Sequence, residues 1–355
     1  MRPAKGRGAL RVAVIGATGM VGAELLDLLE KRRFPISELM PFSSGTARKS
    51  VPFRGRTLAA PGVDPRLLAF CDLVFFVSAD EVSQRLAPAL AARGVWVIDD
   101  SAAFRLDPAV PLVIPEVNAS ALAPDRKLIA GPNCTMTGLA VAGYPLHRSL
   151  RVTEARIASY QAVSGAGRAA LEEFFAQTKQ LASRLAFTGG RAPVLAKPSF
   201  SALPGPIAGN VIPQVGGFDQ AGRSSEENKV AAELRKIWSA PKLKVSVTAV
   251  RVPVIRGHSL AAWLTFAKQT SPARARALLA KAPGLRFSTG SRYPTALDCA
   301  GQDGVSAARL RAGVDPKELC LWIVSDNLLK GAALNSVQIA DELLRRRWLL
   351  RRSSP

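Results

Sequence analysis

The sequence predicts an α/β chain in which a doubly wound, mainly parallel sheet is followed by a second domain of α+β type. Short apolar runs at 10–15, 72–78 and 95–98 have the composition of buried parallel strands. Helical apolar spacing separates them, and such alternation is typical of a doubly wound sheet. Beyond residue 154, strand and helix patterns mix less regularly, which favours a mixed or antiparallel sheet.

Length and composition predict a two-domain globular protein. The chain has 355 residues, 48% of them hydrophobic and 21% charged. An uninterrupted apolar run of about 18 residues, as a transmembrane helix needs, is missing from the sequence. The basic start of the chain lacks the apolar segment of a secretory signal. We therefore expect a cytoplasmic protein without a membrane partner.

Cysteine and histidine usage bears on metal sites and disulfides. Four widely spaced cysteines, without a CxxC pair, accompany only two histidines: Cys71, Cys134, Cys299 and Cys320. This pattern argues against a structural zinc site or a disulfide scaffold and fits a reducing compartment. We predict no metal.

A formal net charge of +21 raises the possibility of a nucleic-acid binder. The basic residues are spread along the chain, apart from runs at 345–347 and 351–352, and no zinc-finger, RNP or basic-zipper pattern accompanies them. We expect no nucleic-acid partner. A positive field that attracts an anionic cofactor and substrate is the alternative.

The first apolar run leads directly into a glycine-rich turn, Gly16 to Gly22, and then into a helix to about Arg33. Glycines at this place let the backbone turn tightly and approach a pyrophosphate at the helix N-terminus. The order strand, GxxGxxG, helix predicts a Rossmann-type dinucleotide site. The predicted contacts are Gly16, Thr18, Gly19, Met20, Val21 and Gly22.

The second strand is expected near 38–42, and the segment 43–49 after it holds hydroxyls and two cations but no carboxylate. A carboxylate there would bind a ribose 2′-hydroxyl and repel a 2′-phosphate. The segment therefore favours NADP over NAD, with a solvated basic loop as the alternative. The predicted contacts are Ser43, Ser44, Thr46 and Arg48.

A third motif, 131–137, reads GPNCTMT between the apolar run 127–130 and helical spacing over 138–150. We predict Cys134 at or near a helix N-terminus, where backbone N–H groups and the helix dipole favour a thiolate. A small buried hydrophobic residue is the alternative for a single cysteine.

Further polar residues combine with this thiol. His258, Arg251 and Gln161 each have a structural alternative when taken singly. Together with Cys134 and a dinucleotide turn they indicate one reaction type, in which a thiolate attacks an activated acyl group and a nicotinamide hydride reduces the thioester.

The sequence resembles the aspartate-β-semialdehyde dehydrogenase family over almost its whole length. The matching motifs, in family order, are GATGMVG (16–22), SAAFR (101–105), VPLVIPEVN (110–118), GPNCT (131–135), SYQAVSGAGR (159–168), NVIPQ (210–214), EENK (226–229), RVPVIRGHS (251–259), YPT (293–295) and SDNLLKGAALNSVQIA (325–340). N-acetyl-glutamyl-phosphate reductase shares the fold and thiol chemistry but has a different cysteine box and histidine motif.

The resemblance implies reductive dephosphorylation of L-aspartyl-4-phosphate with NADPH, giving aspartate semialdehyde and phosphate. This step belongs to the biosynthesis of lysine, threonine, methionine and isoleucine. Cys134 would be the nucleophile, His258 the general acid/base, and Gln161 the residue that orients the thioester. The implied substrate contacts are Arg251 to the α-carboxylate, Glu226 to the amino group, and Arg105, Lys229 and Asn133 at the phosphate. Ser164, Gly165 and Asn327 would contact the cofactor.

The resemblance also implies a glyceraldehyde-3-phosphate-dehydrogenase-like fold. Residues 9–133 and 327–355 would form the dinucleotide-binding domain, and 134–326 the catalytic and dimerisation domain of a homodimer or homotetramer. An acyl-phosphate reductase for another substrate and a non-catalytic dinucleotide-binding paralogue remain as alternatives.

Some positions depart from the family pattern. Gly45 stands where an arginine often contacts the 2′-phosphate, and Arg48 replaces a glycine of that loop. The other departures are Asp100 for Asn, Gly131 for Asn, Leu260 for an acidic residue and Leu328 for Arg.

Overall fold

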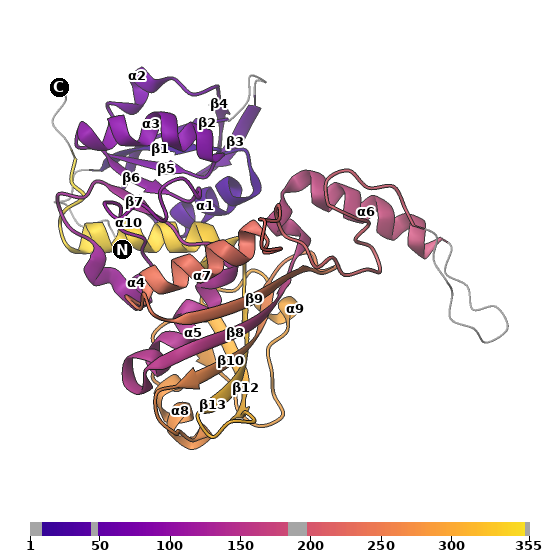
Figure 1. Cartoon of the computed structure of the whole chain (residues 1–355). Coiled ribbons are helices and arrows are strands. Elements are labelled where there is room, and N and C mark those ends of the chain that lie inside the picture. The colour runs from indigo at the N-terminus through magenta and orange to yellow at the C-terminus, as the bar shows by residue number, and fades with distance from the viewer. Residues whose placement is uncertain (1–8, 44–48, 184–196, 352–355) are drawn as a thin grey trace. The chain divides into compact units, whose positions relative to one another are not determined.

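The computed structural model describes residues 9–43, 49–183 and 197–351 (Figure 1). The chain divides into two compact units. The first consists of Met1–Val141, Glu233–Pro241 and Leu328–Pro355, and the second of Ala142–Ala232 and Lys242–Asn327. Compactness alone does not define a catalytic or a cofactor-binding domain, so the predicted functional boundaries at 134 and 327 stay a prediction.

The first unit contains a parallel five-stranded sheet in the order β2-β1-β5-β6-β7. Its strands are β1 (Leu10–Ile15), β2 (Ile36–Phe42), β5 (Leu73–Phe76), β6 (Trp96–Asp99) and β7 (Leu128–Ala130). Since β2 and β5 lie on opposite sides of β1, the connections change direction at β1, which is where such sheets bind ligands. The predicted doubly wound, Rossmann-type sheet is confirmed.

Alternate residues of the strands pack into two different cores. Val12 and Val14 of β1, with Leu73 and Phe75 of β5, belong to one buried cluster. The residues between them belong to a second cluster: Ala13, Ile15, Val74 and Phe76. Because both faces of a parallel sheet are covered, its strands read as continuous apolar runs.

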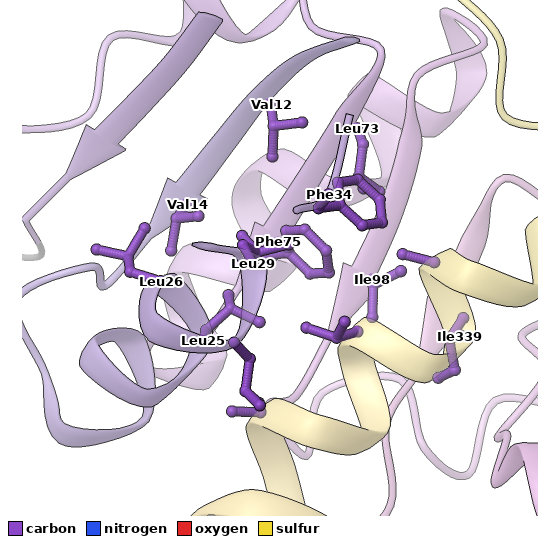
Figure 2. Close-up of a cluster of buried hydrophobic side chains, with 14 of the residues drawn as sticks. Val12, Val14, Leu25, Leu26, Leu29, Phe34, Leu73, Phe75, Ile98 and Ile339 are labelled. Atoms are coloured by element: carbon purple, nitrogen blue, oxygen red, sulfur yellow. The ribbon is translucent and has the colours of Figure 1, made fainter. Parts of the chain in front are cut away.

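Helices cover the two faces. Figure 2 shows Leu25, Leu26 and Leu29 of α1 (Met20–Lys31) and Ile339 of α10 (Leu334–Arg345) in the first cluster. Leu86, Ala87 and Leu90 of α3 (Asp80–Ala92) pack into the second. The shorter helices of this unit are α2 (Pro65–Leu68), α4 (Pro115–Asn118) and η1 (Ala119–Ala121).

Two features of the first unit differ from the expectation. The hairpin of β3 (Lys49–Phe53) and β4 (Arg56–Ala60) was not predicted, because its short strands carry few apolar residues. The apolar spacing after Asp326 and Asn327 predicts one long helix to about Leu350, and a helix is present, but its first turn and its end differ from this expectation. A π-helix, η3 (Leu329–Ala333), precedes α10, and α10 ends before Arg347, whose φ of 59° is left-handed.

The second unit is built on a six-stranded sheet in the order β11-β12-β13-β10-β8-β9. Its strands are β8 (Val152–Gln161), β9 (Lys244–Arg251), β10 (His258–Phe266), β11 (Leu285–Phe287), β12 (Val305–Ala312) and β13 (Glu318–Ser325). The pairs β8–β9 and β11–β12 are parallel and the others antiparallel, so the predicted α+β domain on a mixed sheet is confirmed.

Helical elements lie between the strands of the second sheet in the sequence. They are η2 (Val163–Ala166), α6 (Arg168–Ala182), α7 (Ser225–Ile237), α8 (Pro272–Leu279) and α9 (Ala296–Cys299). The helical patterns over 168–185 and 225–238 predict two of them, α6 and α7.

The glycine and proline content of 189–214 predicts a long loop. Residues 197–214 contain neither helix nor strand, and 189–196 lie outside the described residues. The alternating sequence VSVTAVRVPV (245–254) predicts a strand to Val254. Strand β9 ends at Arg251, two residues before Pro253, which cannot donate to a sheet.

Candidate active site

The glycine-rich turn joins β1 to α1 in a conformation that requires glycine. Gly16 has a φ of 88°, and a Cβ added there would lie 2.3 Å from the carbonyl oxygen of Val77. A Cβ at Gly22 would lie 2.3 Å from the carbonyl oxygen of Gly16. Gly19 caps α1, and its N–H donates to the Gly16 carbonyl at 3.0 Å. The turn fits a pyrophosphate at the start of α1.

The side chains that flank this turn agree with that fit. Thr18, Met20 and Val21 are half-buried where α1 begins, so their backbone stays near the surface at the carboxyl end of β1. All six residues predicted to bind the dinucleotide therefore lie in one place. Their contacts with a cofactor remain a prediction.

The segment after β2 is described only in part. Ser43 is buried, its N–H donates to the Pro61 carbonyl at 2.8 Å, and its hydroxyl donates to the same oxygen at 3.3 Å. Ser44, Thr46 and Arg48 lie outside the described residues. The predicted 2′-phosphate contacts therefore stay a prediction.

Cys134 is the first residue of α5 (Cys134–Leu150), as predicted. The side-chain oxygen of Asn133 accepts hydrogen bonds from the N–H groups of Thr135, at 2.8 Å, and Met136, at 3.1 Å. Cys134 is half-buried, whereas the other three cysteines are buried. An accessible thiol at a helix N-terminus is placed for a reactive thiolate rather than for core packing.

Gly331 of the π-helix lies against Cys134 and was not among the predicted site residues. A Cβ at Gly331 would be 2.7 Å from Cβ of Cys134 and 3.0 Å from its Cα. Glycine here lets η3 approach the start of α5 closely. The available signal was a glycine inside an otherwise helical pattern, and π-helical turns are frequent at functional sites.

Arg105 lies in the same unit as the Cys134 turn. Its Nη1 donates to Oε1 of Glu233 at 3.2 Å and its Nη2 to the Asp100 carbonyl at 2.7 Å. The Arg105 Nε is buried and has no hydrogen-bond partner among the described residues. Burial lowers the pKa of Arg105, but the charges of Glu233 and Cys134 outweigh it and leave this pKa raised. Arg105 is therefore a fixed cation, and its Nε–H makes no hydrogen bond within the described residues.

The second unit brings Gln161 and Arg251 together at the ends of adjacent parallel strands. They are register partners, the last residues of β8 and β9. The Gln161 amide nitrogen donates to the Ser159 hydroxyl at 3.2 Å and to Oε1 of Glu226 at 3.3 Å. Nη1 of Arg251 donates to the Ala162 carbonyl at 2.8 Å.

His258 is the first residue of β10 and is fully buried. The N–H of Ala162 donates to its Nδ1 at 3.0 Å. Burial, followed by the charge of Arg251, lowers the pKa of His258 to about 3. The imidazole is therefore neutral near pH 7, with its proton on Nε2.

Gly165 lies next to both the guanidinium of Arg251 and the imidazole of His258. A Cβ at Gly165 would be 3.0 Å from Nη1 of Arg251, 3.1 Å from Cε1 of His258 and 3.2 Å from its Nε2. Because Gly165 has no side chain, its backbone can pack closely against both of these buried groups. Gly165 was predicted at the cofactor, and this packing gives it a second possible role.

Glu226 and Lys229 lie in the first turns of α7 and are half-buried. The turn is capped by Ser224 and Glu227: the Ser224 N–H donates to Glu227 Oε2 at 2.7 Å, and the Glu227 N–H to the Ser224 hydroxyl at 3.3 Å. The sequence SSEE (224–227) predicts a helix start with a hydroxyl N-cap, and the structure confirms it with Ser224 as the cap.

Ser164 and Asn327 contact one another, with the Asn327 amide nitrogen 2.9 Å from the Ser164 hydroxyl. The Asn327 side-chain oxygen accepts from the N–H of Gly257 at 2.9 Å. Asn327 thus holds the backbone next to His258. Their predicted contact with the cofactor is not tested by these bonds.

The structure therefore assembles the predicted residues in two groups. Arg105, Asn133 and Cys134 meet in the first unit, and Gln161, Glu226, Arg251 and His258 in the second. In the described ranges, no group of three or more His, Cys, Asp or Glu side chains is arranged to hold a metal ion. A helix long and apolar enough to cross a membrane does not occur within these ranges either.

Comparison with protein families matches both parts of the chain. Residues 11–124 match the semialdehyde dehydrogenase NAD-binding domain, and residues 144–330 match the semialdehyde dehydrogenase dimerisation domain.

Individual relatives are similar over nearly their whole length. An aspartate-semialdehyde dehydrogenase from Synechocystis sp. is 39% identical over 96% of this chain and 99% of its own. One from Bacillus subtilis is 37% identical over 94% and 98%. The crystal structure of aspartate semialdehyde dehydrogenase II from Vibrio cholerae has a TM-score of 0.87 and 35% identity, covering 95% of this chain and 98% of that one. A second structure of it, in complex with ASA, also has a TM-score of 0.87.

Proposed function

The chain belongs to the aspartate-semialdehyde dehydrogenase family, and from this premise we propose that it interconverts L-aspartyl-4-phosphate and aspartate semialdehyde with NADP(H). Family membership confirms the predicted oxidoreductase class. The observation that carries the proposal is the half-buried thiol of Cys134 at the start of α5, in one unit with the fixed cation Arg105.

The relatives named above are aspartate-semialdehyde dehydrogenases, which supports this substrate over N-acetyl-glutamyl phosphate. The Vibrio cholerae enzyme was solved with ASA, and we propose the same compound as substrate here. Glu226 also favours a free amino group, because an acylated amine would give this carboxylate no cation to pair with.

Three side chains of the second unit would hold the amino acid. Arg251 suits the α-carboxylate, since a guanidinium binds a carboxylate through two parallel hydrogen bonds. Glu226 would take the amino group. Gln161 already donates to Glu226 at 3.3 Å, so we propose that it orients the reacting acyl group relative to the same carboxylate.

Cys134 would act as the nucleophile in both directions. In reduction, the thiolate attacks the acyl phosphate, the C–S bond forms, and phosphate leaves with the electrons of the C–O bond. In oxidation, the thiolate would add to the aldehyde carbon. After loss of hydride to NADP, phosphate would attack the thioester carbonyl and expel the thiolate with the electrons of the C–S bond. The N-terminus of α5 favours the charged sulfur throughout.

His258 would contribute through Nε2. Since Nδ1 accepts from Ala162, the neutral ring presents an N–H at Nε2. We propose that this N–H stabilises the oxyanion formed on the substrate carbonyl. The predicted transfer of the thiol proton to His258 would first require Ala162 to release Nδ1.

Arg105 would bind phosphate through its unused Nε–H, which is buried and ready to donate. Lys229 would add a second cation, and Asn133 a neighbouring polar group. Fixed cations suit both an incoming and a departing phosphate.

The turn from Gly16 to Gly22 would hold the dinucleotide at the start of α1, with Ser164, Gly165 and Asn327 as further contacts. NADP(H), when bound, supplies or accepts the hydride. We propose NADP rather than NAD because 43–49 holds two cations and no carboxylate.

We further propose a homodimer or homotetramer formed through the domain that matches the family's dimerisation domain. We also propose a cytoplasmic location and, from the proposed reaction, a role in the biosynthesis of lysine, threonine, methionine and isoleucine.

An assay in the oxidative direction tests the function. Aspartate semialdehyde, phosphate and NADP should give NADPH. Replacing the substrate by N-acetyl-glutamate semialdehyde, or NADP by NAD, should each lower the turnover by about tenfold or more, the scale of one lost charge-assisted contact. Equal turnover with the acylated semialdehyde would reject the substrate assignment. Equal turnover with NAD would reject only the cofactor preference.

A further inference from the structure

We propose that Glu233 is a positioning residue that couples the phosphate-binding Arg105 to the turn carrying Cys134. One oxygen of its carboxylate accepts from Nη1 of Arg105 at 3.2 Å. The other accepts from the N–H of Asn133, the residue before the nucleophile, at 2.7 Å. The inference rests on the proposed function, in which Arg105 binds phosphate.

Burial makes this connection rigid. Glu233 is only 1% exposed and Arg105 only 9%. In such surroundings, breaking one of the two contacts leaves a buried charge or a buried N–H without a partner, which is strongly destabilising. Glu233 therefore has one favourable arrangement, in which both contacts are made, and a shift of Arg105 is transmitted to Asn133.

The next turn of α7 holds the backbone of the same arginine. Nζ of Lys236 donates to the carbonyl oxygens of Arg105 at 2.8 Å, Asp107 at 2.6 Å and Val110 at 2.8 Å. Lys236 fixes the loop, and Glu233 fixes the guanidinium that the loop carries. The last part of α7 thus holds Arg105 in place and leaves its Nε–H available to an anion.

This arrangement has two consequences for the reaction. The guanidinium of Arg105 has a fixed position relative to Cys134. A phosphate bound to it is therefore held in one orientation while the thiolate attacks and the phosphate leaves. Glu233 also offsets part of the positive charge of Arg105, which interacts with the thiolate of Cys134. A change at Glu233 should therefore alter both phosphate binding and thiol reactivity.

The test is Glu233→Gln. The glutamine oxygen can still accept from Asn133, but its NH₂ then faces the Arg105 donor and disturbs the guanidinium. We expect the KM for phosphate to rise about tenfold, the scale of one lost charge-assisted hydrogen bond. The KM for aspartate semialdehyde should stay within about twofold. Alkylation of Cys134 by iodoacetamide at pH 7 should become about threefold faster, since loss of the carboxylate strengthens the positive field at sulfur.

Asp72→Asn is the matched control. Asp72 is a buried carboxylate of the same unit that also accepts from a backbone N–H, that of Arg11 at 2.7 Å, and from an arginine Nη2 at 3.4 Å. Its substitution should lower the melting temperature without changing the phosphate KM or the alkylation rate.

Three outcomes separate the claims. A raised phosphate KM with faster alkylation in Glu233→Gln alone supports the coupling. Wild-type values for both in this variant overturn it. If the wild-type protein shows no phosphate-dependent turnover, the proposed function fails, and the alkylation rate alone then decides whether Glu233 acts on the nucleophile.

Discussion

The backbone N–H of Ala162 donates a 3.0 Å hydrogen bond to Nδ1 of His258. Ala162 follows β8, which carries Gln161, while His258 begins β10, so the bond ties the imidazole to the neighbouring strand. Because a neutral imidazole has one donor and one acceptor, the bond assigns the proton to Nε2.

The first prediction concerns the charge of His258. Its pKa of about 3, which results from burial and then Arg251, lies below the ordinary value of 6.5. The folded protein therefore binds fewer protons here than the unfolded chain, and stability is lost as pH falls from 6.5 towards 3. Nitrogen-15 spectra should show a neutral Nε2–H ring from pH 5 to 8. A midpoint near 6.5 would contradict this. With only two histidines, a His147→Gln variant assigns the signals.

The second prediction concerns turnover after His258→Ala. Loss of the Nε2–H donor should lower kcat by about 10²- to 10³-fold, as for one oxyanion donor, with a much smaller change in the KM of aspartate semialdehyde. Steady-state kinetics measure both. His147→Ala, which alters the other histidine, should leave kcat within about twofold. A raised KM with wild-type kcat would mean that His258 only binds substrate.

The third prediction uses Gly165→Ala. The added methyl group would lie 3.0 Å from Nη1 of Arg251 and 3.1 Å from Cε1 of His258, so both groups must shift. A displacement of this size should reduce kcat/KM for aspartate semialdehyde by about 10- to 100-fold. Gly217→Ala is the control, since a Cβ there meets nothing within 4 Å. If both variants keep wild-type kcat/KM, the close approach at Gly165 has no functional role.

The fourth prediction concerns Asp100. Burial, opposed by the Ser336 hydroxyl and reinforced by Asp99, raises the pKa of Asp100 from 3.8 to about 6. The folded state then binds the proton more tightly than the unfolded chain, so stability falls as pH rises from about 4 to about 6. Asp100→Asn should remove this loss. Above pH 6 the free energy of unfolding of the variant should exceed that of the wild type by up to about 3 kcal/mol.

Urea unfolding at a series of pH values measures the effect of Asp100. The difference between Asp100→Asn and wild type should appear only as pH rises past 4. A difference that is the same at pH 4 and pH 8 would show that Asp100 does not titrate in this range. Ser336→Ala removes a hydrogen bond to Oδ1, of 2.5 Å, and should move the transition to higher pH.

Much of the fold could be predicted because local patterns determine it. The strands of the first unit are continuous apolar runs since both faces of their sheet are buried. Glycines 16, 19 and 22 mark a turn in which positions 16 and 22 have no room for a Cβ. Cys134 follows a good N-cap, Asn133, and the helix begins there as expected.

Other features depend on contacts between distant residues and could not be read from local sequence. The π-helix at 329–333 lies where Gly331 packs on Cys134, almost 200 positions earlier in the chain. Glu233 carries no local signal, because its partners Arg105 and Asn133 are brought to it only by folding. Strand β10 was missed since His258 and Ser259 are buried polar residues at its start.

Two positions that depart from the family pattern, Asp100 and Gly131, are neighbours in the folded structure. A Cβ at position 131 would lie 2.2 Å from Oδ1 of Asp100, so glycine at 131 makes room for this carboxylate. Read along the chain, Asp100 and Gly131 are unrelated substitutions. In the fold they form one local arrangement.

The most direct test of the account is a single-turnover experiment on Cys134. Aspartate semialdehyde and NADP, mixed with the protein in the absence of phosphate, should produce a burst of about one NADPH per subunit. Mass spectrometry should then find the aspartyl group on the peptide that contains Cys134, and added phosphate should release it. Cys134→Ser, with a far weaker nucleophile, should still bind NADP but give no burst. A burst or sustained phosphate-dependent turnover in that variant would contradict the assignment of Cys134 as the nucleophile.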